Sequence, residues 1–241
     1  MIRTCALLSL LVAAPAVLRA QAPNELVARA LQAMGGETAL RGLRTVSVDY
    51  HGAVFGIGQS ETAESPPRAT VASGSVRTDW QGFRRERSQE LRPAAGPPAL
   101  SRRVTAGGIG LLVNASGTPS EAADGPGNVA AAERAMRREP DRILLAALDN
   151  PGALAPLPDR TWRGEQHDGV RFALGPDTLA LYFDRFSGLL TLVEAISDDP
   201  ILGDRRTATA YTRWQSAGAV RLPRQVDVTA NGQPQEHWIH T

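Results

Sequence analysis

Few residues in this sequence have types and spacings that could support catalysis or metal binding. His237 and His240 form the closest histidine pair, and at this spacing on a helix they could share a metal ion. The flanking residues instead predict a strand, where an odd spacing places two side chains on opposite faces. We therefore expect structural or exposed histidines. His51 and His167 stand alone, and His167 lies in a predicted turn.

Carboxylates and serines also lack the patterns that known chemistries require. Asp198-Asp199-Pro200 and Asp204 gather acids in one loop, but without the ligand spacing of an EF-hand, so turn-forming residues are favoured over a calcium site. Ser60, Ser116 and Ser187 lack the Gly-x-Ser-x-Gly context of a nucleophile elbow. A carboxylate pair for glycoside hydrolysis stays open, because such pairs meet in space rather than in sequence. We predict no catalytic residue, no cofactor and no metal.

The charged residues exclude some partners and leave one open question. The 241-residue chain has a formal net charge of +1, and its 26 basic residues are all arginine. This balance gives no basic surplus for nucleic-acid binding, and without lysine no Schiff base can form. Arginines cluster within 68–103, among them Arg84, Arg85, Arg87, Arg102 and Arg103. The favoured interpretation is that they lie on the solvated outer faces of antiparallel strands. The alternative is that they form a surface that binds an anionic group.

The N-terminus predicts export. Met1-Ile2-Arg3 is followed by an apolar run from Cys5 to Val12 and by Ala20-Gln21-Ala22, the pattern of a secretory signal peptide over residues 1–22. Cleavage is expected after Ala22, with Ala20 as the second choice. It would remove Cys5, the only cysteine, so the mature chain would contain no disulfide and no thiol nucleophile. Lipidation of Cys5 is disfavoured because only four residues precede it. We expect a periplasmic or secreted protein.

The rest of the chain predicts short helices and many strands. Expected helices cover 24–34, with a short turn at 37–43, then 129–138 and 140–148, and the segment 114–127 is a loop by composition. Hairpin turns are expected at His167-Asp168-Gly169, Phe186-Ser187-Gly188 and Asn231-Gly232. The alternating segments predict strands at 45–50, 68–79, 82–91, 100–106, 109–113, 161–166, 170–174, 179–184, 189–197, 206–215, 221–230 and 235–240.

These elements predict an α+β fold. Consecutive strands joined by tight turns pair in antiparallel fashion, and the chain shows no βαβ alternation. An apolar stripe on the helix 140–148 must face an apolar surface, for which a sheet is the natural partner. We expect one domain over residues 23–241, built as a curved antiparallel sheet, a half-open β-barrel, with helices packed on its concave face.

Three segments resemble a known class of periplasmic protein. The resemblance is to the outer-membrane lipoprotein-sorting (carrier) type, and it lies in Leu181 to Leu190, in Asp198 to Asp204, and in Tyr211 to Trp214 with the following Gly218 to Pro223. Ala33 to Leu40 resembles the opening of exported proteins of this kind, some of which carry a metallo-β-lactamase-fold domain. The resemblance covers 24–50 and 177–241. It implies a half-open barrel that holds acyl chains or other hydrophobic groups. The His-x-His-x-Asp-His motif of a metallo-hydrolase is absent from the sequence.

The leading functional hypothesis is therefore a non-enzymatic carrier. Its partner would be a hydrophobic small molecule, a lipid or a lipoprotein, with transient contact to the outer or inner membrane surface, and the sequence sets no oligomeric state. The alternative is an accessory or N-terminal domain that packs on another exported protein or on a hydrolase domain. Most aromatic residues should fill the core, whereas a ligand cavity is expected to be lined by Trp80, Leu144, Leu148, Phe183 and Trp214.

Overall fold

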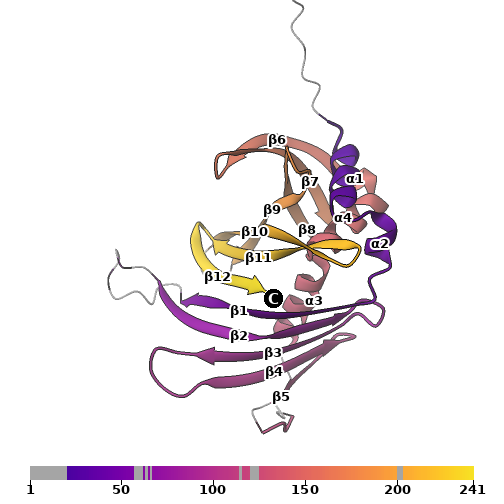
Figure 1. Ribbon diagram of the computed structural model, residues 1–241. Coiled ribbons are helices and arrows are strands. Elements are labelled where there is room, and N and C mark those ends of the chain that lie inside the picture. Colours follow the sequence, from indigo (N-terminus) through magenta and orange to yellow (C-terminus); the bar gives the residue numbers. More distant parts are fainter. Residues whose placement is uncertain are drawn as a thin grey trace, which may run out of the picture.

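The computed structural model in Figure 1 describes residues 21–56, 62, 65, 67–113, 116–119, 125–199 and 203–241. Residues 1–20 of the predicted signal peptide, Ser60 and parts of the predicted loop 114–127 lie outside these ranges, as do Pro200 and the side chains of Asp198 and Asp199. Within the described ranges the chain forms one antiparallel sheet and four α-helices, so the predicted α+β class is confirmed.

The strands follow one another as a meander that is broken once. Each strand pairs with its neighbour in the chain, except that β5 and β6 do not pair and that β1 pairs with β12, which brings the first and the last strand together. The sheet does not close, and β5 and β6 form its edges. The strands are β1 Thr45–Gly56, β2 Arg68–Asp79, β3 Arg84–Arg92, β4 Ala99–Ala106, β5 Ile109–Val113, β6 Leu154–Trp162, β7 Glu165–Leu174, β8 Asp177–Asp184, β9 Leu190–Asp199, β10 Gly203–Ala217, β11 Val220–Ala230 and β12 Gln233–His240.

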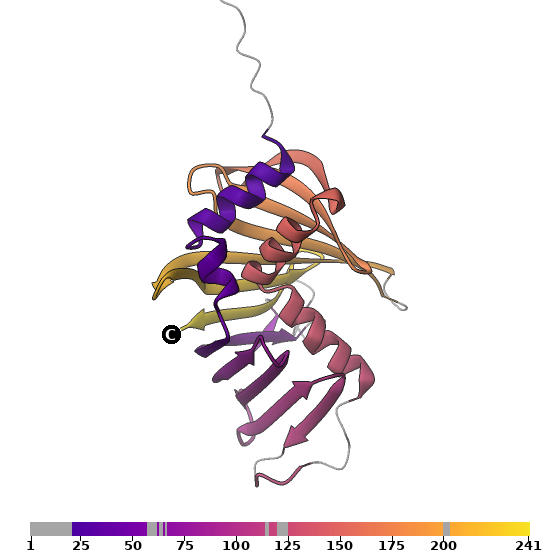
Figure 2. The same cartoon turned by 90° about the vertical axis from the view of Figure 1, so that its right-hand side faces the viewer.

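The helices cover one face of this curved sheet (Figure 2). They are α1 Pro23–Ala33, α2 Glu37–Arg41, α3 Pro126–Arg137 and α4 Pro140–Asp149, followed by the 3-10 turn Pro151–Ala153. α1 packs on α4, and both contact β7, whereas α3 lies against β4 and β5. The two halves of the sheet are therefore covered by different helices, and the junction between α3 and α4 lies over the middle strands.

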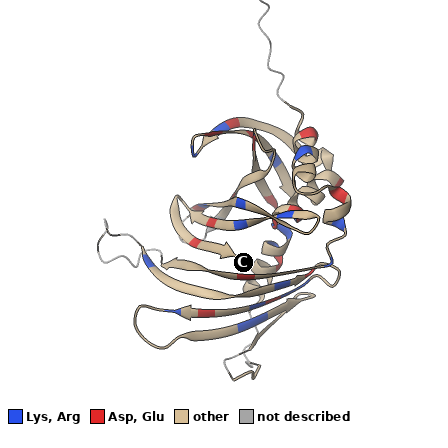
Figure 3. Ribbon diagram, viewed as in Figure 1, with Lys and Arg blue, Asp and Glu red and all other residues tan. Residues whose placement is uncertain are grey.

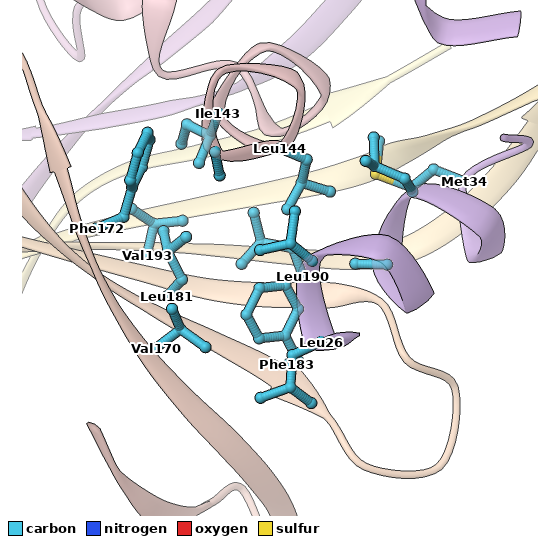
Figure 4. Close-up of a cluster of buried hydrophobic side chains, with 14 of the residues drawn as sticks. Leu26, Met34, Ile143, Leu144, Val170, Phe172, Leu181, Phe183, Leu190 and Val193 are labelled. Carbon is cyan, nitrogen blue, oxygen red and sulfur yellow. The ribbon is translucent and has the colours of Figure 1, made fainter. Parts of the chain in front are cut away.

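The helices α1 and α4 close a filled core over the strands β7 to β9 (Figure 4). Leu26, Val27, Ala30 and Leu31 form the buried stripe of α1, at the spacing expected of one helix face. The predicted apolar stripe of α4 faces the sheet, as expected, and its Ile143, Leu144 and Ala147 are fully buried. Together with the core side chains of the strands, these residues leave this half of the molecule densely packed.

Two of the predicted hairpin positions have different outcomes. Asn231 and Gly232 both adopt positive φ, at 48° and 82°, and join β11 to β12 as expected. The turn predicted at His167-Asp168-Gly169 is wrong, because these residues lie inside β7 and pair with β6 and β8. The hairpin turns instead at Arg163 and Gly164, with φ of 52° and 84°, within the strand predicted at 161–166.

Gly169 has a packing role rather than a turn role. A β-carbon at this position would stand 2.7 Å from the Pro158 carbonyl oxygen, at the point where the β6–β7 register shifts. Glycine in a strand interior often marks such a close approach of two backbones. Asp168-Gly169 therefore has the composition of a turn, but Gly169 is needed because the backbone of β6 passes close to it. The sequence did not predict this bulged, proline-containing edge strand.

Candidate ligand-binding cavity

A cavity of about 550 Å³ lies between the middle strands and the junction of α3 with α4. Its volume falls within the range of about 300–1,000 Å³ that is typical of small-molecule sites. The apolar part of its lining comes from five strands, from Trp80 just after β2 and from the helices α3 and α4: Val46, Val48, Tyr50, Val76, Trp80, Ala131, Ala135, Pro140, Tyr211, Ala217, Leu222, Pro223, Val226, Val228 and Trp238. Polar groups are fewer and are set between these side chains, which is the usual composition of a hydrophobic binding site.

Two aromatic side chains form the floor of the cavity. Tyr50 and Trp238 come from the paired strands β1 and β12, and their rings meet edge to face with centroids 5.0 Å apart. Both residues are buried, although both line the cavity. Edge-to-face contact is a favoured geometry for aromatic pairs. The floor is therefore an apolar surface that two paired strands of the sheet supply.

Glycines in the neighbouring strands make room for these rings. Gly52 lies opposite Trp238, where a β-carbon would stand 3.0 Å from the indole ring. Gly74 lies opposite Tyr50, and a β-carbon there would be 2.8 Å from the tyrosine hydroxyl. Because this space is open, the Tyr50 hydroxyl crosses β2 and donates a hydrogen bond to the Ser88 carbonyl oxygen at 3.2 Å.

The helical wall is held by polar contacts at the α3–α4 junction. Arg85 of β3 forms an ion pair with Glu139 at 2.5 Å and donates to the Thr78 hydroxyl at 3.1 Å. The Tyr211 hydroxyl donates to the Arg138 carbonyl oxygen at 3.2 Å. Burial raises the pKa of Tyr211, so this hydroxyl stays protonated and keeps its role as a donor. The junction is thus fixed to both β3 and β10.

A buried ion pair stands at the start of α4. Asp141 accepts a hydrogen bond from Arg142 at 2.8 Å, and the Arg142 guanidinium lies 4.4 Å from the centroid of the Trp80 ring. Burial raises the pKa of Asp141, whereas the charge of Arg142 opposes that rise. Arg142 also donates to the Leu40 carbonyl oxygen at 3.1 Å. The pair therefore connects the cavity wall at Trp80 to α2.

Of the five side chains predicted to line a cavity, Trp80 lies on the lining of this one. Leu144 and Phe183 are fully buried in the core beneath α1 and α4, and Leu148 and Trp214 pack against that core. Contact between any of the five and a ligand stays a prediction. The sequence analysis did not select Tyr50, Trp238 or Val226 for the site. Only the pairing of β1 with β12 places Tyr50 beside Trp238.

The arginine-rich strands β3 and β4, which carry blue segments in Figure 3, divide their charges between the two faces of the sheet. Arg84 and Arg102 are exposed and contact Glu86 on the outer face, as predicted. The outer-face prediction is wrong for Arg85 and Arg87, which line the cavity. Strand alternation explains this split, since residues 85 and 87 face the opposite side from residue 84.

The predicted placement of the histidine pair on a strand is confirmed. His240 lines the cavity, whereas the His237 ring lies on the opposite face, with its Nδ1 2.6 Å from Asp227 Oδ1. No group of three His, Cys, Asp or Glu side chains within the described ranges is arranged to hold a metal ion. His167 is buried inside β7, where its ring meets Trp162 edge to face.

The contact between His237 and Asp227 predicts a pH dependence of stability. Burial would raise the pKa of Asp227, but hydrogen bonds from His237 and Gln225 bring it below its ordinary value. A lowered pKa in the folded state stabilises the protein above the ordinary value of about 3.9, and this stabilisation is lost as the pH falls through the folded-state pKa. Asp227→Asn should therefore lower the free energy of unfolding at pH 7 and reduce its loss in acid.

Urea unfolding at several pH values between 7 and 2 would measure this effect. Asp49→Asn, at an exposed position on β1, is the matched control and should follow the wild-type curve. Equal slopes below pH 4 for wild type and Asp227→Asn would contradict the prediction.

A second hollow of about 570 Å³ lies on the other face of the sheet. It is bordered by charged side chains, among them the ion pair of Arg160 with Glu194 at 2.7 Å, and by Asp204 and Arg206. Arg160 also lies over the Tyr182 ring, 5.4 Å from its centroid. The opposed charges compensate one another, so this hollow offers less apolar surface to a hydrophobic ligand than the cavity beneath α3.

Comparisons with known proteins bear on the fold. No protein-family model matches the sequence, and no curated protein matches it. The structure is similar to that of a DUF1329 family protein from Desulfovibrio piger, with a TM-score of 0.51 and 8% identity over 91% of each chain. A LolA superfamily protein from Nitrosomonas europaea gives a TM-score of 0.44 and 10% identity over 92% of each chain. At 8% identity the likeness to the DUF1329 family protein concerns the fold alone.

Proposed function

We propose that this protein binds a hydrophobic ligand in the cavity between its curved sheet and the α3–α4 junction, and that it does so without catalysis. The observation that carries the proposal is the preformed aromatic floor of Tyr50 and Trp238 within a cavity of about 550 Å³. Removing apolar ligand surface from water contributes about 25 cal/mol per Å². A cavity that is already formed avoids much of the ordering cost of binding.

The proposal places the protein outside the cytoplasm. The signal-peptide pattern over residues 1–22 supports export to the periplasm or secretion, with residues 23–241 as one ligand-binding domain. No helix in the described part of the chain is long and apolar enough to cross a membrane. The cargo would be a lipid, an acyl chain of a lipoprotein or another hydrophobic molecule, taken up or released during transient contact with a membrane surface.

Blocking the cavity from the helical wall tests this proposal. Ala135 is an exposed residue of α3 that lines the cavity, so Ala135→Trp should place an indole ring in the site without disturbing the core. We expect the affinity for the neutral fluorescent probe N-phenyl-1-naphthylamine to fall by about tenfold or more, the equivalent of about 1.4 kcal/mol. Fluorescence titration at fixed protein concentration would measure the change.

A matched control is available on the same helix. Ala130 is also exposed on α3 but lies outside the cavity lining, so Ala130→Trp should bind the probe as the wild type does. Probe binding that is absent in the wild type, or that is equal in both tryptophan variants, would contradict the proposed site.

Exposed apolar side chains favour a second candidate function, as an accessory domain that packs on another exported protein. Leu100 and Ile109 lie on the outer face near the β5 edge and are 55% and 73% exposed. Leu100 lies at the start of β4 and Ile109 lies opposite Ala106 at its end, so both ends of this edge expose an apolar side chain to a partner chain. This function would leave the cavity without a ligand, and Leu100→Gln with Ile109→Gln would then reduce binding to a partner rather than to the probe.

A further inference from the structure

One charged side chain of the cavity has an environment unlike that of the others. Arg87 lies on β3 opposite Val76, and its guanidinium carbon is 5.3 Å from the centroid of the Tyr50 ring and 5.4 Å from that of Trp238. Its Nε donates a hydrogen bond to the Tyr50 hydroxyl at 3.1 Å. The aromatic floor therefore holds the guanidinium in place within the cavity, and cation–π contact stabilises its charge in part.

The other arginines of the cavity lining have carboxylate partners. Arg85 pairs with Glu139 at 2.5 Å, while Arg138 and Arg134 contact Asp177 at 2.9 Å and 3.6 Å. Within the described ranges no carboxylate oxygen comes within 4.0 Å of the Arg87 guanidinium. Among the described residues, Arg87 is thus the arginine of the cavity lining that has no carboxylate partner within 4.0 Å.

One acid that lines the same cavity is hydrogen-bonded to the aromatic floor. Glu236 of β12 lines the cavity, and its carboxylate accepts a hydrogen bond from the Trp238 indole nitrogen at 2.7 Å. Arg103 of β4 lies directly opposite Arg87 in the sheet, so a second positive charge shares this row.

The unused donors of Arg87 make it suited to bind an anion. Its guanidinium has five N–H donors, of which the one on Nε is used by Tyr50. The donors on its two terminal nitrogens form no hydrogen bond with any residue that the structure describes. Planar donors of this kind match the oxygens of a carboxylate or a phosphate, and charge-assisted hydrogen bonds are about twice as strong as neutral ones.

We propose that the ligand of this cavity is an amphiphile with a single anionic head group, a carboxylate or a phosphate, which Arg87 binds while the apolar tail contacts Val48, Val76 and Val226. This inference rests on the proposed function and specifies its ligand. It favours a free fatty acid or an alkyl phosphate over the ester- and amide-linked acyl chains of a lipoprotein, which offer no such charge.

Ligands that share one tail and differ in the head group test the inference. Dodecanoate, dodecyl phosphate and dodecanol would each displace N-phenyl-1-naphthylamine from the wild type at pH 8, where both acids are ionised. We expect one or both anions to bind at least about tenfold more tightly than dodecanol. The stronger of the two anions identifies the head group as a carboxylate or a phosphate.

Variants of Arg87 assign the preference to this side chain. Arg87→Gln should lower the affinities for the two anions by a larger factor than the affinity for dodecanol and so remove the preference, whereas Arg87→Lys should retain part of the preference. Arg84→Gln, on the outer face of the same strand, is the matched control and should keep the full preference. Thermal unfolding of each variant would verify that it is folded. If Arg87→Gln does not fold, Arg87→Lys takes its place as the test, and an unchanged preference for the anions in that variant would overturn the role of Arg87.

The failures can be distinguished. If dodecanol binds as tightly as the anions, or if Arg87→Gln weakens all three ligands equally, the head-group inference is overturned while the hydrophobic site remains. If neither the probe nor any dodecyl ligand binds the wild type, the proposed function itself is overturned.

Discussion

Replacing Phe183 by alanine is expected to lower the free energy of unfolding by about 3–5 kcal/mol, the usual cost of truncating a buried phenylalanine. Phe183 is fully buried, lies opposite Leu190 in the sheet and belongs to the core that α1 and α4 cover. Urea unfolding followed by circular dichroism would measure the loss. Because the side chain lies outside the cavity lining, the affinity of the folded variant for N-phenyl-1-naphthylamine should stay that of the wild type.

Trp80→Leu is the informative comparison, because the sequence predicted a lining role for both side chains. Trp80 is only partly buried and lines the cavity beside Arg142. This variant should lose less stability than Phe183→Ala and should bind the probe more weakly than the wild type. Loss of probe binding in folded Phe183→Ala would instead place Phe183 at the ligand, as the sequence analysis expected.

The strand pattern shows why much of this fold was predictable. Alternation of apolar and polar residues located β2 and β5 at their observed bounds and the strands β8 to β12 to within three residues. The β6–β7 hairpin was misplaced, because Asp168-Gly169 has the composition of a turn and Arg163-Gly164 was not recognised as one. Gly169 of β7 is required because the β6 backbone lies close to it. This contact depends on the tertiary structure, so the alternation of apolar and polar residues does not indicate it.

The cavity was less predictable than the core. Tyr50 and Trp238 are separated by most of the chain, and they meet only because β1 pairs with β12. A meander predicts pairing between neighbours in sequence, whereas the pairing of the first strand with the last is a long-range contact that no local pattern indicates. The sequence predicted Leu144 and Phe183 to line the cavity because the pattern of apolar residues on a concave face is the same whether a helix or a ligand covers that face.

The arginines show a second limit of sequence reasoning. Arg84, Arg85 and Arg87 are close in sequence, yet one contacts Glu86 on the outer face, one pairs with Glu139 and one lies over two aromatic rings. Alternation assigns residues 85 and 87 to one face and residue 84 to the other. It does not say which face is concave, since that depends on the helices α3 and α4, which follow much later in the chain.

Removing the carboxylate of Asp141 is expected to have the second large effect, a loss of about 3–5 kcal/mol, the usual cost of breaking a buried ion pair. Asp141 and Arg142 side chains are 5% and 20% exposed, and no other acid lies within 4.0 Å of Arg142 in the described ranges. Asp141→Ala would leave the guanidinium between Trp80 and the Leu40 carbonyl oxygen without a counter-charge.

A double-mutant cycle separates the pair from the packing around it. Arg142→Met in the Asp141→Ala background removes the stranded charge and should restore most of the lost stability, because apolar replacement of a buried pair is often neutral. Asp149→Ala is the matched control on the same helix. Its partner Arg41 is 42% exposed and Asp149 itself 52%, so its loss should be no more than about 1 kcal/mol. Equal losses at the two aspartates would show that burial of Asp141 does not govern the stability of the α3–α4 junction.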